Sequence, residues 1–134
     1  MKKILLSYDG HPSSAKALEV AKHHALTFKA RLDIVNVVVR EKTDQHEDIE
    51  EAEKILAKAE KGCQRDNIEC TTKLVIKGAT PAEALLNYAE EKGYDLIIIG
   101  IRRTSQLGKL LLGSNAQNII LNAPCPVLSI NKNV

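Results

Sequence analysis

The sequence is poor in aromatic side chains and has little excess of either charge. It has no tryptophan, and aromatic residues make up only 3% of its 134 residues. Nineteen basic residues are balanced by 17 acidic ones, which gives a net charge of +2. Proteins that bind single-stranded nucleic acid need basic surfaces and aromatic stacking platforms, so these scarcities argue against a nucleic-acid partner. Any basic site must be local.

Cysteine is scarce, and no long apolar run is present. The three cysteines, Cys63, Cys70 and Cys125, form no C-x-x-C pair, and their odd number argues against a secreted disulfide framework. The apolar run near the start spans only residues 4–6, too short for the core of a signal peptide, and no segment approaches membrane-spanning length. We therefore expect a cytoplasmic protein with no membrane partner.

Several catalytic patterns are also missing. The phosphate loop G-x-x-x-x-G-K-[ST], the nucleophile elbow G-x-S-x-G and paired carboxylates do not occur. The four histidines have no partners at metal-ligand spacing. Hydrolytic machinery is therefore not visible, and we expect at most slow hydrolytic activity.

Apolar strand-like runs alternate with helix-like periodicities along the whole chain. This alternation predicts right-handed crossovers and a parallel sheet covered on both faces. The predicted fold is one domain, residues 1–134, a Rossmann-like three-layer α/β sandwich with four helices and a five-stranded sheet in the order 3-2-1-4-5. The predicted strands are Lys3–Ser7, Arg31–Val39, Glu69–Ile76, Asp95–Gly100 and Pro126–Ile130.

The segment Ile97–Ser114 is the strongest candidate for a binding site. It leads from a buried strand through Gly100 into a basic loop that ends at Gly113 and Ser114, just before a helix. Backbone N–H groups and a hydroxyl at a helix start suit phosphate oxygens. An equally good explanation is that Gly100 permits a tight exit from the strand and Ser114 caps the helix.

The first predicted helix follows the turn at residues 9–12, and Ser13 or Ser14 is available as its cap.

Asp9 follows the first strand and carries two interpretations. In such sheets ligands bind beyond the carboxyl ends of the strands, where Asp9 could accept a hydrogen bond from a ribose hydroxyl or hold a metal ion through water. The alternative is an Asx-turn before Gly10.

With these residues in view, the chain resembles the universal stress protein family over essentially its full length. The opening ILLSYDGHPSSAKALEVA is similar to the family's first strand, aspartate turn and helix. DLIIIGIRR is similar to its fourth strand, and LLLGSNAQNIILNAPCPVLSI to its closing glycine-serine, helix and last strand.

The resemblance implies an ATP site built on the family motif G-x-x-G-x9-G-[ST]. On this chain Gly100 is the first glycine, Gly113 the third and Ser114 the hydroxyl, while Arg103 stands where the second glycine belongs. Arg103 either donates to phosphate or narrows the cradle, because it adds a Cβ and a long side chain.

The same resemblance places two further residues near the nucleotide. It implies that Asp9 lies near adenosine and that the backbone of Val37 contacts adenine. It also implies a homodimer in which Pro126–Ile130 of two subunits pair at a sheet edge.

Three functions follow from these observations. The leading one is a cytoplasmic stress-response or signalling module that binds ATP, alone or with Mg²⁺. The second, motivated by Arg103, is a dimeric interaction protein of the same fold that binds no nucleotide. The third is a weak ATPase or adenylyl-transfer enzyme in which Asp9 or His11 positions water.

Overall fold

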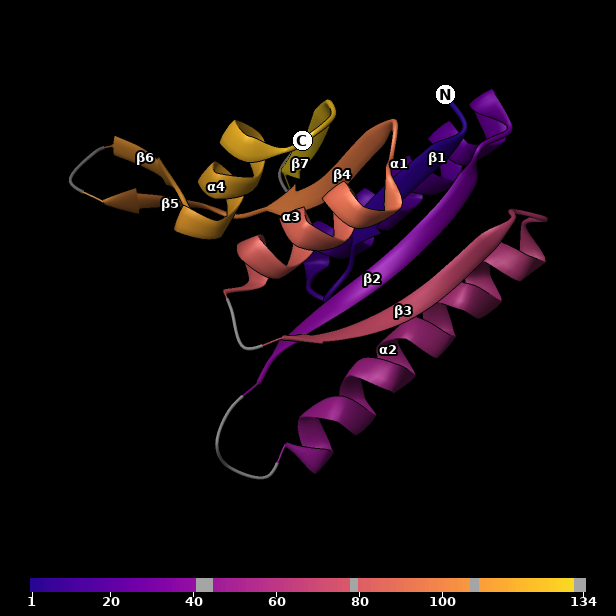
Figure 1. Ribbon diagram of the computed structural model, residues 1–134, viewed down its shortest axis with the longest axis horizontal. Helices are drawn as coiled ribbons and strands as arrows, with labels where there is room; N and C mark the ends of the chain where they lie inside the picture. The colour runs from indigo at the N-terminus through magenta and orange to yellow at the C-terminus, as the bar shows by residue number, and fades with distance from the viewer. Residues whose placement is uncertain (41–44, 78–79, 107–108, 132–134) are drawn as a thin grey trace.

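A five-stranded sheet forms the centre of the computed structural model (Figure 1). The structure describes residues 1–40, 45–77, 80–106 and 109–131, with side chains at all of these except Lys77, 103–106 and 109–111. The strand order is β3-β2-β1-β4-β7, and every neighbouring pair is parallel. The predicted order is confirmed, since β7 is the fifth strand of this sheet along the chain. Its strands are β1 (Lys3–Ser7), β2 (Arg31–Val39), β3 (Cys70–Lys77), β4 (Leu96–Ile101) and β7 (Val127–Asn131).

Helices cover both faces of this sheet. The buried residues of α1 and α2 pack against one face, and those of α3 and α4 pack against the other. The four predicted helices are present, as α1 (Pro12–Phe28), α2 (His46–Arg65), α3 (Pro81–Lys92) and α4 (Ser114–Asn122).

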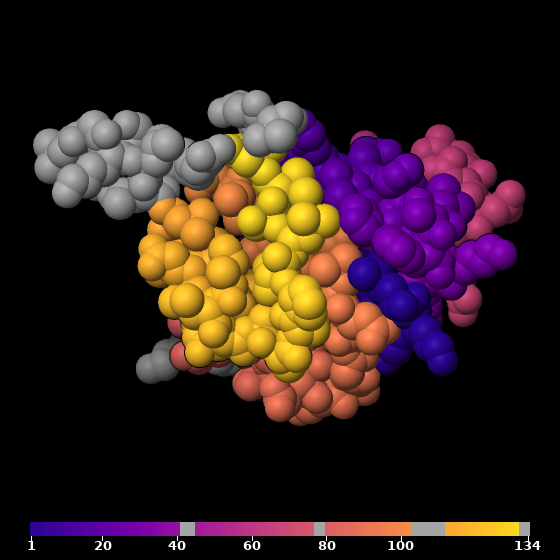
Figure 2. All heavy atoms as spheres, turned by 90° about the horizontal axis from the view of Figure 1, so that it is seen from above, coloured from indigo at the N-terminus to yellow at the C-terminus, as the bar shows by residue number. Residues whose placement is uncertain are grey.

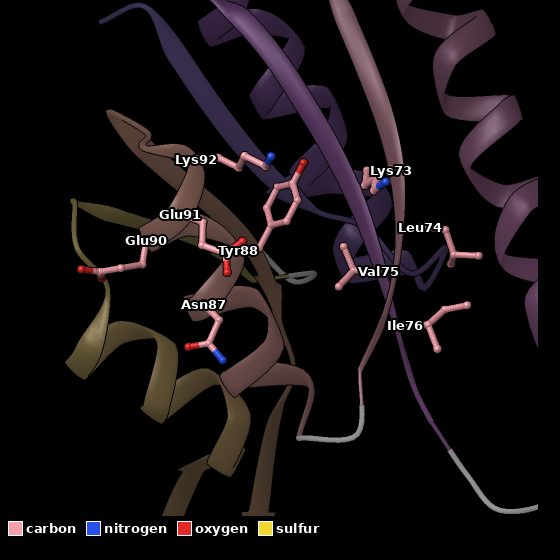
Figure 3. A pocket seen from close by; sticks show the side chains of 9 residues that line it. All are labelled: Lys73, Leu74, Val75, Ile76, Asn87, Tyr88, Glu90, Glu91 and Lys92. Atoms are coloured by element: carbon pink, nitrogen blue, oxygen red, sulfur yellow. The ribbon is translucent and has the colours of Figure 1, made fainter.

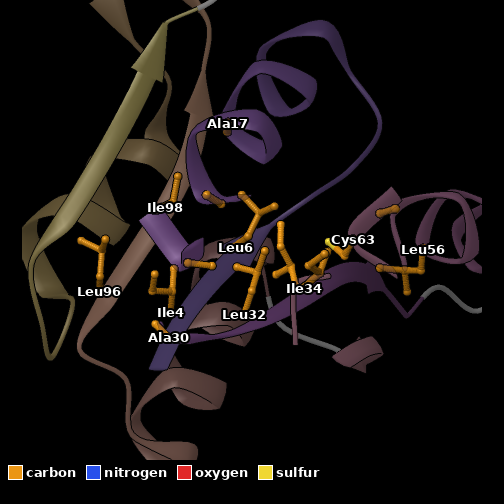
Figure 4. Packing of buried hydrophobic residues seen from close by; sticks show 14 residues of the cluster. Ile4, Leu6, Ala17, Ala30, Leu32, Ile34, Leu56, Cys63, Leu96 and Ile98 are labelled. Atoms are coloured by element: carbon orange, nitrogen blue, oxygen red, sulfur yellow. The ribbon is translucent and has the colours of Figure 1, made fainter. Parts of the chain in front are cut away.

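The core consists of two apolar clusters, one on each side of the sheet. Alternate residues of β1 enter opposite clusters: Leu6 packs with α1 and α2, and Leu5 packs with α3 and α4. Figure 4 shows the first cluster, in which Leu56 and Cys63 of α2 face the strands. Because both faces are covered, the central strands are continuous apolar runs rather than alternating ones.

Helix α3 begins with a side-chain cap, whereas the start of α1 differs from the sequence analysis. Thr80 caps α3, where its hydroxyl accepts a hydrogen bond from Glu83 N at 3.3 Å. The expected serine cap of α1 is wrong, because the N-cap is His11, which makes no side-chain cap bond. Ser13 and Ser14 instead lie buried in the first turn of α1.

The segment between β4 and α4 was expected to be a loop and instead contains a hairpin. Strands β5 (Arg103–Gln106) and β6 (Lys109–Leu112) pair antiparallel and form a second, separate sheet. Figure 1 shows this hairpin extending away from the main sheet. Neither strand has the alternating apolar pattern by which a strand is recognised in a sequence, which explains why the hairpin was not predicted.

Candidate functional site

Three of the predicted site residues lie at the carboxyl edge of neighbouring strands. Asp9 follows β1, Val37 lies in the last part of β2, and Gly100 lies near the end of β4. The chain leaves β1 toward β2 on one side, while β4 pairs with β1 on the other. Open α/β sheets bind ligands at such a reversal of strand order, in the crevice beyond the carboxyl ends of the strands, which here is the position between β1 and β4.

The hairpin brings the remaining predicted positions together along the backbone. Arg103 pairs with Leu112, so the backbone of Arg103 lies beside the residue that precedes Gly113. Gly113 is the N-cap of α4, and Ser114 is its first residue. The base of the hairpin, which we call its neck, therefore brings the backbone of Arg103 close to Gly113 and Ser114 at the start of α4. The side chain of Arg103 is outside the described residues.

Asp9 forms the Asx-turn that the sequence left as one of two alternatives. Its Oδ1 accepts hydrogen bonds from the backbone N–H of His11 at 2.9 Å and from the hydroxyl of Ser14 at 2.7 Å. Gly10 follows with φ +83°, a conformation that favours glycine. Asp9 is exposed, and Oδ2 has no hydrogen-bond partner within the described part of the chain. The turn therefore leaves one carboxylate oxygen available to a ligand.

Gly100 is required by packing. A Cβ built at Gly100 would lie 2.5 Å from the carbonyl carbon of Ser13 and 2.6 Å from the backbone N of Ser14. The first turn of α1 thus sits directly on the backbone of β4. The structure contains no tight exit at Gly100, which is paired with Ile130 inside β4; a glycine is needed there because a helix packs on it.

Gly113 has the opposite surroundings. Its φ is −60°, which any residue adopts, and no described atom lies within 4 Å of the position that its Cβ would take. No side chain caps α4, so N–H groups of its first turn lack side-chain partners. Ser114 does not cap the helix either, because it is the first helical residue. Open space and unpaired donors therefore coincide at this helix end.

Val37 is half-buried beside the cluster formed with α3 and α4. Tyr8 N donates to the carbonyl of Val35 at 2.8 Å, and backbone groups of alternate β2 residues point the same way. The N–H and C=O of Val37 therefore point to the β1 side, beyond the last residue of β1, which is Ser7. This orientation suits a backbone contact with a planar ring.

The sequence analysis missed a buried carboxylate in β2. Asp33 is 4% exposed and accepts hydrogen bonds from Thr71 Oγ1 at 2.6 Å, Tyr94 OH at 2.8 Å and Arg31 Nε at 2.8 Å. Burial alone would raise the pKa of Asp33, but the bonds from Thr71, Tyr94 and Arg31 outweigh it and hold the pKa below its usual value. The signal in the sequence was the charged Asp33 within a strand that is mostly apolar. This cluster lies toward the start of β2, away from the carboxyl edge.

A second missed contact joins the two helices on one face. Asn115 Oδ1 accepts a hydrogen bond from Ala82 N at 3.2 Å, which ties the first turn of α4 to the first turn of α3. Nothing in the sequence indicated this contact.

The structure also has a hollow of about 530 Å³ that includes none of the six predicted site residues. It lies between β3 and α3 (Figure 3). Among its lining residues are Lys73, Val75, Asn87, Tyr88, Glu91 and Lys92.

Two further observations concern metal ions and membranes. Within the described ranges, no three His, Cys, Asp or Glu side chains are grouped closely enough to hold a metal ion. No helix among the described residues is long and apolar enough to cross a membrane.

A family model described as "Universal stress protein family" matches residues 1–131. The chain belongs to this family. It is 36% identical to a universal stress protein of Thermus aquaticus, with 96% of this chain and 98% of the relative covered. It is 32% identical to universal stress protein YxiE of Bacillus subtilis, with 96% and 97% covered.

Solved structures of universal stress proteins share the fold. An Archaeoglobus fulgidus protein in complex with dAMP has a TM-score of 0.74 and 22% identity, with 97% of each chain covered. An Arabidopsis thaliana protein with AMP bound has a TM-score of 0.72 and 13% identity, with 98% of this chain and 92% of that chain covered.

Proposed function

We propose that this universal stress protein binds an adenine nucleotide at the carboxyl edge of its sheet and acts as a nucleotide-dependent stress-response module. The observation that carries this proposal is the open, uncapped start of α4 at Gly113, beside the neck of the hairpin. Helix N-termini with unpaired N–H groups attract phosphate. Two structural relatives were solved with dAMP and AMP, which supports an adenine nucleotide as the ligand.

In this proposal each of the six residues has a defined task. Phosphates bind the first N–H groups of α4 and the Ser114 hydroxyl, and the absence of a Cβ at Gly113 lets them approach. Arg103 begins the hairpin strand that borders this space and supplies positive charge. Asp9 accepts a hydrogen bond from ribose through Oδ2, and the backbone of Val37 contacts adenine. Gly100 lets α1 pack on β4 at the crevice.

As the ligand we propose ATP, alone or with Mg²⁺. The described residues offer Asp9 as an exposed carboxylate at this edge and hold no metal-binding cluster, so Mg²⁺ would be coordinated chiefly by phosphate oxygens and water. Magnesium commonly binds in this way beside nucleotides.

We further propose that the protein forms a homodimer through the free edge of β7. The side chains of Ile120 and Leu121 in α4 are 41% and 78% exposed, unusually open for large apolar residues. Figure 2 shows α4 and β7 side by side on one face. Pairing of two β7 edges would cover the strand and apolar surface beside it. The three free cysteines suit a reducing compartment, and we place the protein in the cytoplasm.

The nucleotide site is tested by isothermal titration with Mg-ATP, with AMP in parallel, on the wild-type protein and on Gly113→Ser. Serine is a good N-cap residue, so we expect this variant to be as stable as wild type or more so by about 0.5 kcal/mol. Its hydroxyl would occupy the open space and engage the N–H groups of α4. Affinity for ATP should therefore fall at least about tenfold, because charge-assisted bonds from those groups are lost.

Gly62→Ala is the matched control. Gly62 lies in α2, away from the carboxyl edge, and its added Cβ would meet no atom closer than 3.7 Å. It should leave affinity unchanged. No heat of binding to wild type at high micromolar ATP, or equal affinity for wild type and Gly113→Ser, would contradict the proposal.

A further inference from the structure

Strand β3 leaves one side of its backbone unpaired. It is an outer strand of the sheet, and no described strand pairs with its far side. Leu32 N donates to the carbonyl of Glu69 at 3.0 Å, while Leu32 is level with Cys70. In a parallel ladder, backbone groups of alternate residues point to opposite sides. The N–H and C=O groups that point outward therefore belong to Cys70, Thr72, Leu74 and Ile76.

The hollow of about 530 Å³ opens along this same edge. Four consecutive β3 residues, 73–76, line it, so the backbone edge itself forms part of its wall. Val75, which is 4% exposed, faces α3, and Tyr88 belongs to the opposite wall. Figure 3 shows the Tyr88 ring reaching from α3 toward the strands, with its hydroxyl end directed to the level of Lys73 and Lys92. The unpaired backbone groups of β3 and the amphipathic hollow thus lie side by side.

The charges around this hollow favour an acidic occupant at one end. Lys73 and Lys92 make no ion pair with any residue in the described ranges. Glu91 stands on the α3 wall, whereas Glu90 points away from the strands in Figure 3. An acidic side chain level with Lys73 would pair with its ammonium group, and Lys92 adds positive charge to the same hollow.

Lys73 also disfavours a second copy of the chain as the occupant. Two-fold antiparallel pairing of two β3 edges, in the register centred on the hollow, would place the two Lys73 ammonium groups opposite each other. Like charges at neighbouring cross-strand positions are destabilising, and lysine on an edge strand is a common protection against self-pairing. A different chain with an acidic residue at this level avoids the repulsion.

We propose that the outer edge of β3 and the adjoining hollow bind an extended segment of another protein, which adds a strand to the sheet. The segment carries an acidic side chain level with Lys73 and an apolar one two residues away, over Val75 and Tyr88. Main-chain bonds to Thr72 and Leu74 supply affinity, and alternate side chains in the hollow supply specificity. This surface is separate from the proposed nucleotide site.

The probe is the peptide Ac-Gly-Thr-Val-Thr-Glu-Thr-Val-Thr-Gly-NH2, titrated into the full-length ¹⁵N-labelled protein. Its Val-Glu-Val face reads the same in both chain directions, so the orientation of the added strand need not be known. Amide chemical shifts should change most at Thr72, Leu74 and Ile76, whose N–H groups point outward. The absence of shifts along β3, or the same shifts on concentrating the protein without peptide, would overturn the proposal.

Two N-methylated peptides test the backbone ladder without altering the protein. One is methylated at its threonines and the other at its valines and glutamate. Because only alternate residues of an added strand bond to β3, one of these peptides should bind and the other should not. Equal binding by both would overturn the proposal.

A charge exchange tests the acidic specificity. Lys73→Glu should weaken binding of the glutamate peptide by about fivefold to tenfold and strengthen binding of the matching lysine peptide. Lys73 is exposed, so the fold should be unaffected. If Lys73→Glu leaves the preference between the two peptides unchanged, Lys73 does not select the ligand and the proposal fails.

Discussion

At the scale of single residues, the two glycines of the nucleotide motif differ completely in their surroundings. Gly100 has no room for a Cβ, because α1 lies against it, whereas a Cβ at Gly113 would meet no atom of the described residues within 4 Å. Both are the same letter in the sequence. The spacing of the two glycines could be recognised in the sequence. That Gly100 is needed for packing while Gly113 leaves space depends on which helix lies nearby, and the local sequence does not contain that information.

Asp33 shows how a charge is kept inside the sheet. Three donors converge on this carboxylate from β3, from the segment between α3 and β4, and from its own strand: Thr71, Tyr94 and Arg31. Burial and the bond to Asp33 raise the pKa of Tyr94, so its phenol stays protonated and continues to donate. Removing one member of such a buried, hydrogen-bonded cluster is destabilising, because it leaves a buried charge or polar group unpaired.

We expect Asp33→Asn to lower the free energy of unfolding at pH 7 by about 1–3 kcal/mol, because an amide turns a donor toward groups that are donors themselves. The pKa of Asp33 is lower in the folded protein, so its stabilisation is present above the unfolded-state pKa of about 4 and is lost as pH falls through the folded-state pKa. Wild-type stability should therefore fall below about pH 4, and the variant should lack this part of the fall. Urea unfolding between pH 7 and pH 2 measures both.

Glu69→Gln is the control for removing a negative charge at this end of the sheet. Glu69 is exposed, and the change should alter stability by less than about 0.5 kcal/mol. If Asp33→Asn is equally mild, the three hydrogen bonds contribute nothing net to stability.

At the scale of secondary-structure elements, the strands and helices of the main sheet could be predicted well, and the hairpin could not. The buried strands are apolar on both faces, and α3 has both its Thr80 cap and Pro81 in its first turn, so local chemistry and packing agree. The start of α1 was predicted less well because Ser14 forms a bond to Asp9 in preference to capping the helix. Tertiary contacts decided that choice.

The contact between α1 and β4 gives a direct test at this scale. Gly100→Ala should lower the free energy of unfolding by about 1–3 kcal/mol, since its Cβ would require the first turn of α1 to move away from β4. Urea denaturation without nucleotide isolates this effect from any loss of binding. Gly62→Ala, whose Cβ meets only ordinary contacts, should be neutral or stabilising. Unchanged stability of Gly100→Ala would mean that the helix adjusts freely.

At the scale of the whole molecule, the alternation of elements predicts a parallel sheet covered on both faces, whereas it does not predict the properties of the two sheet edges. β3 and β7 are both outer strands. Only the structure distinguishes them: β3 borders a charged hollow, and β7 adjoins α4 with its exposed apolar side chains. We therefore expect the two edges to have different partners.

The proposed homodimer predicts that a proline on the outer side of β7 prevents association. Ile97 N donates to the carbonyl of Pro126 at 3.0 Å, so the N–H of Ser129 points away from β4. Ser129→Pro should shift the protein from dimer to monomer in sedimentation equilibrium while it leaves the pairing with β4 intact. Thr72→Pro, the equivalent change on the outer side of β3, should leave the dimer unchanged. A monomeric wild type, or a dimer that survives Ser129→Pro, would exclude this interface.

The first turn of α1 touches both sides of the crevice between β1 and β4. Ser14 holds the carboxylate of Asp9, and the backbone of Ser13 and Ser14 rests on Gly100. These two positions are thus fixed relative to each other before any ligand arrives. A nucleotide would not have to bear the entropic cost of ordering this half of its site, and that cost would fall only on the groups around the hairpin and α4.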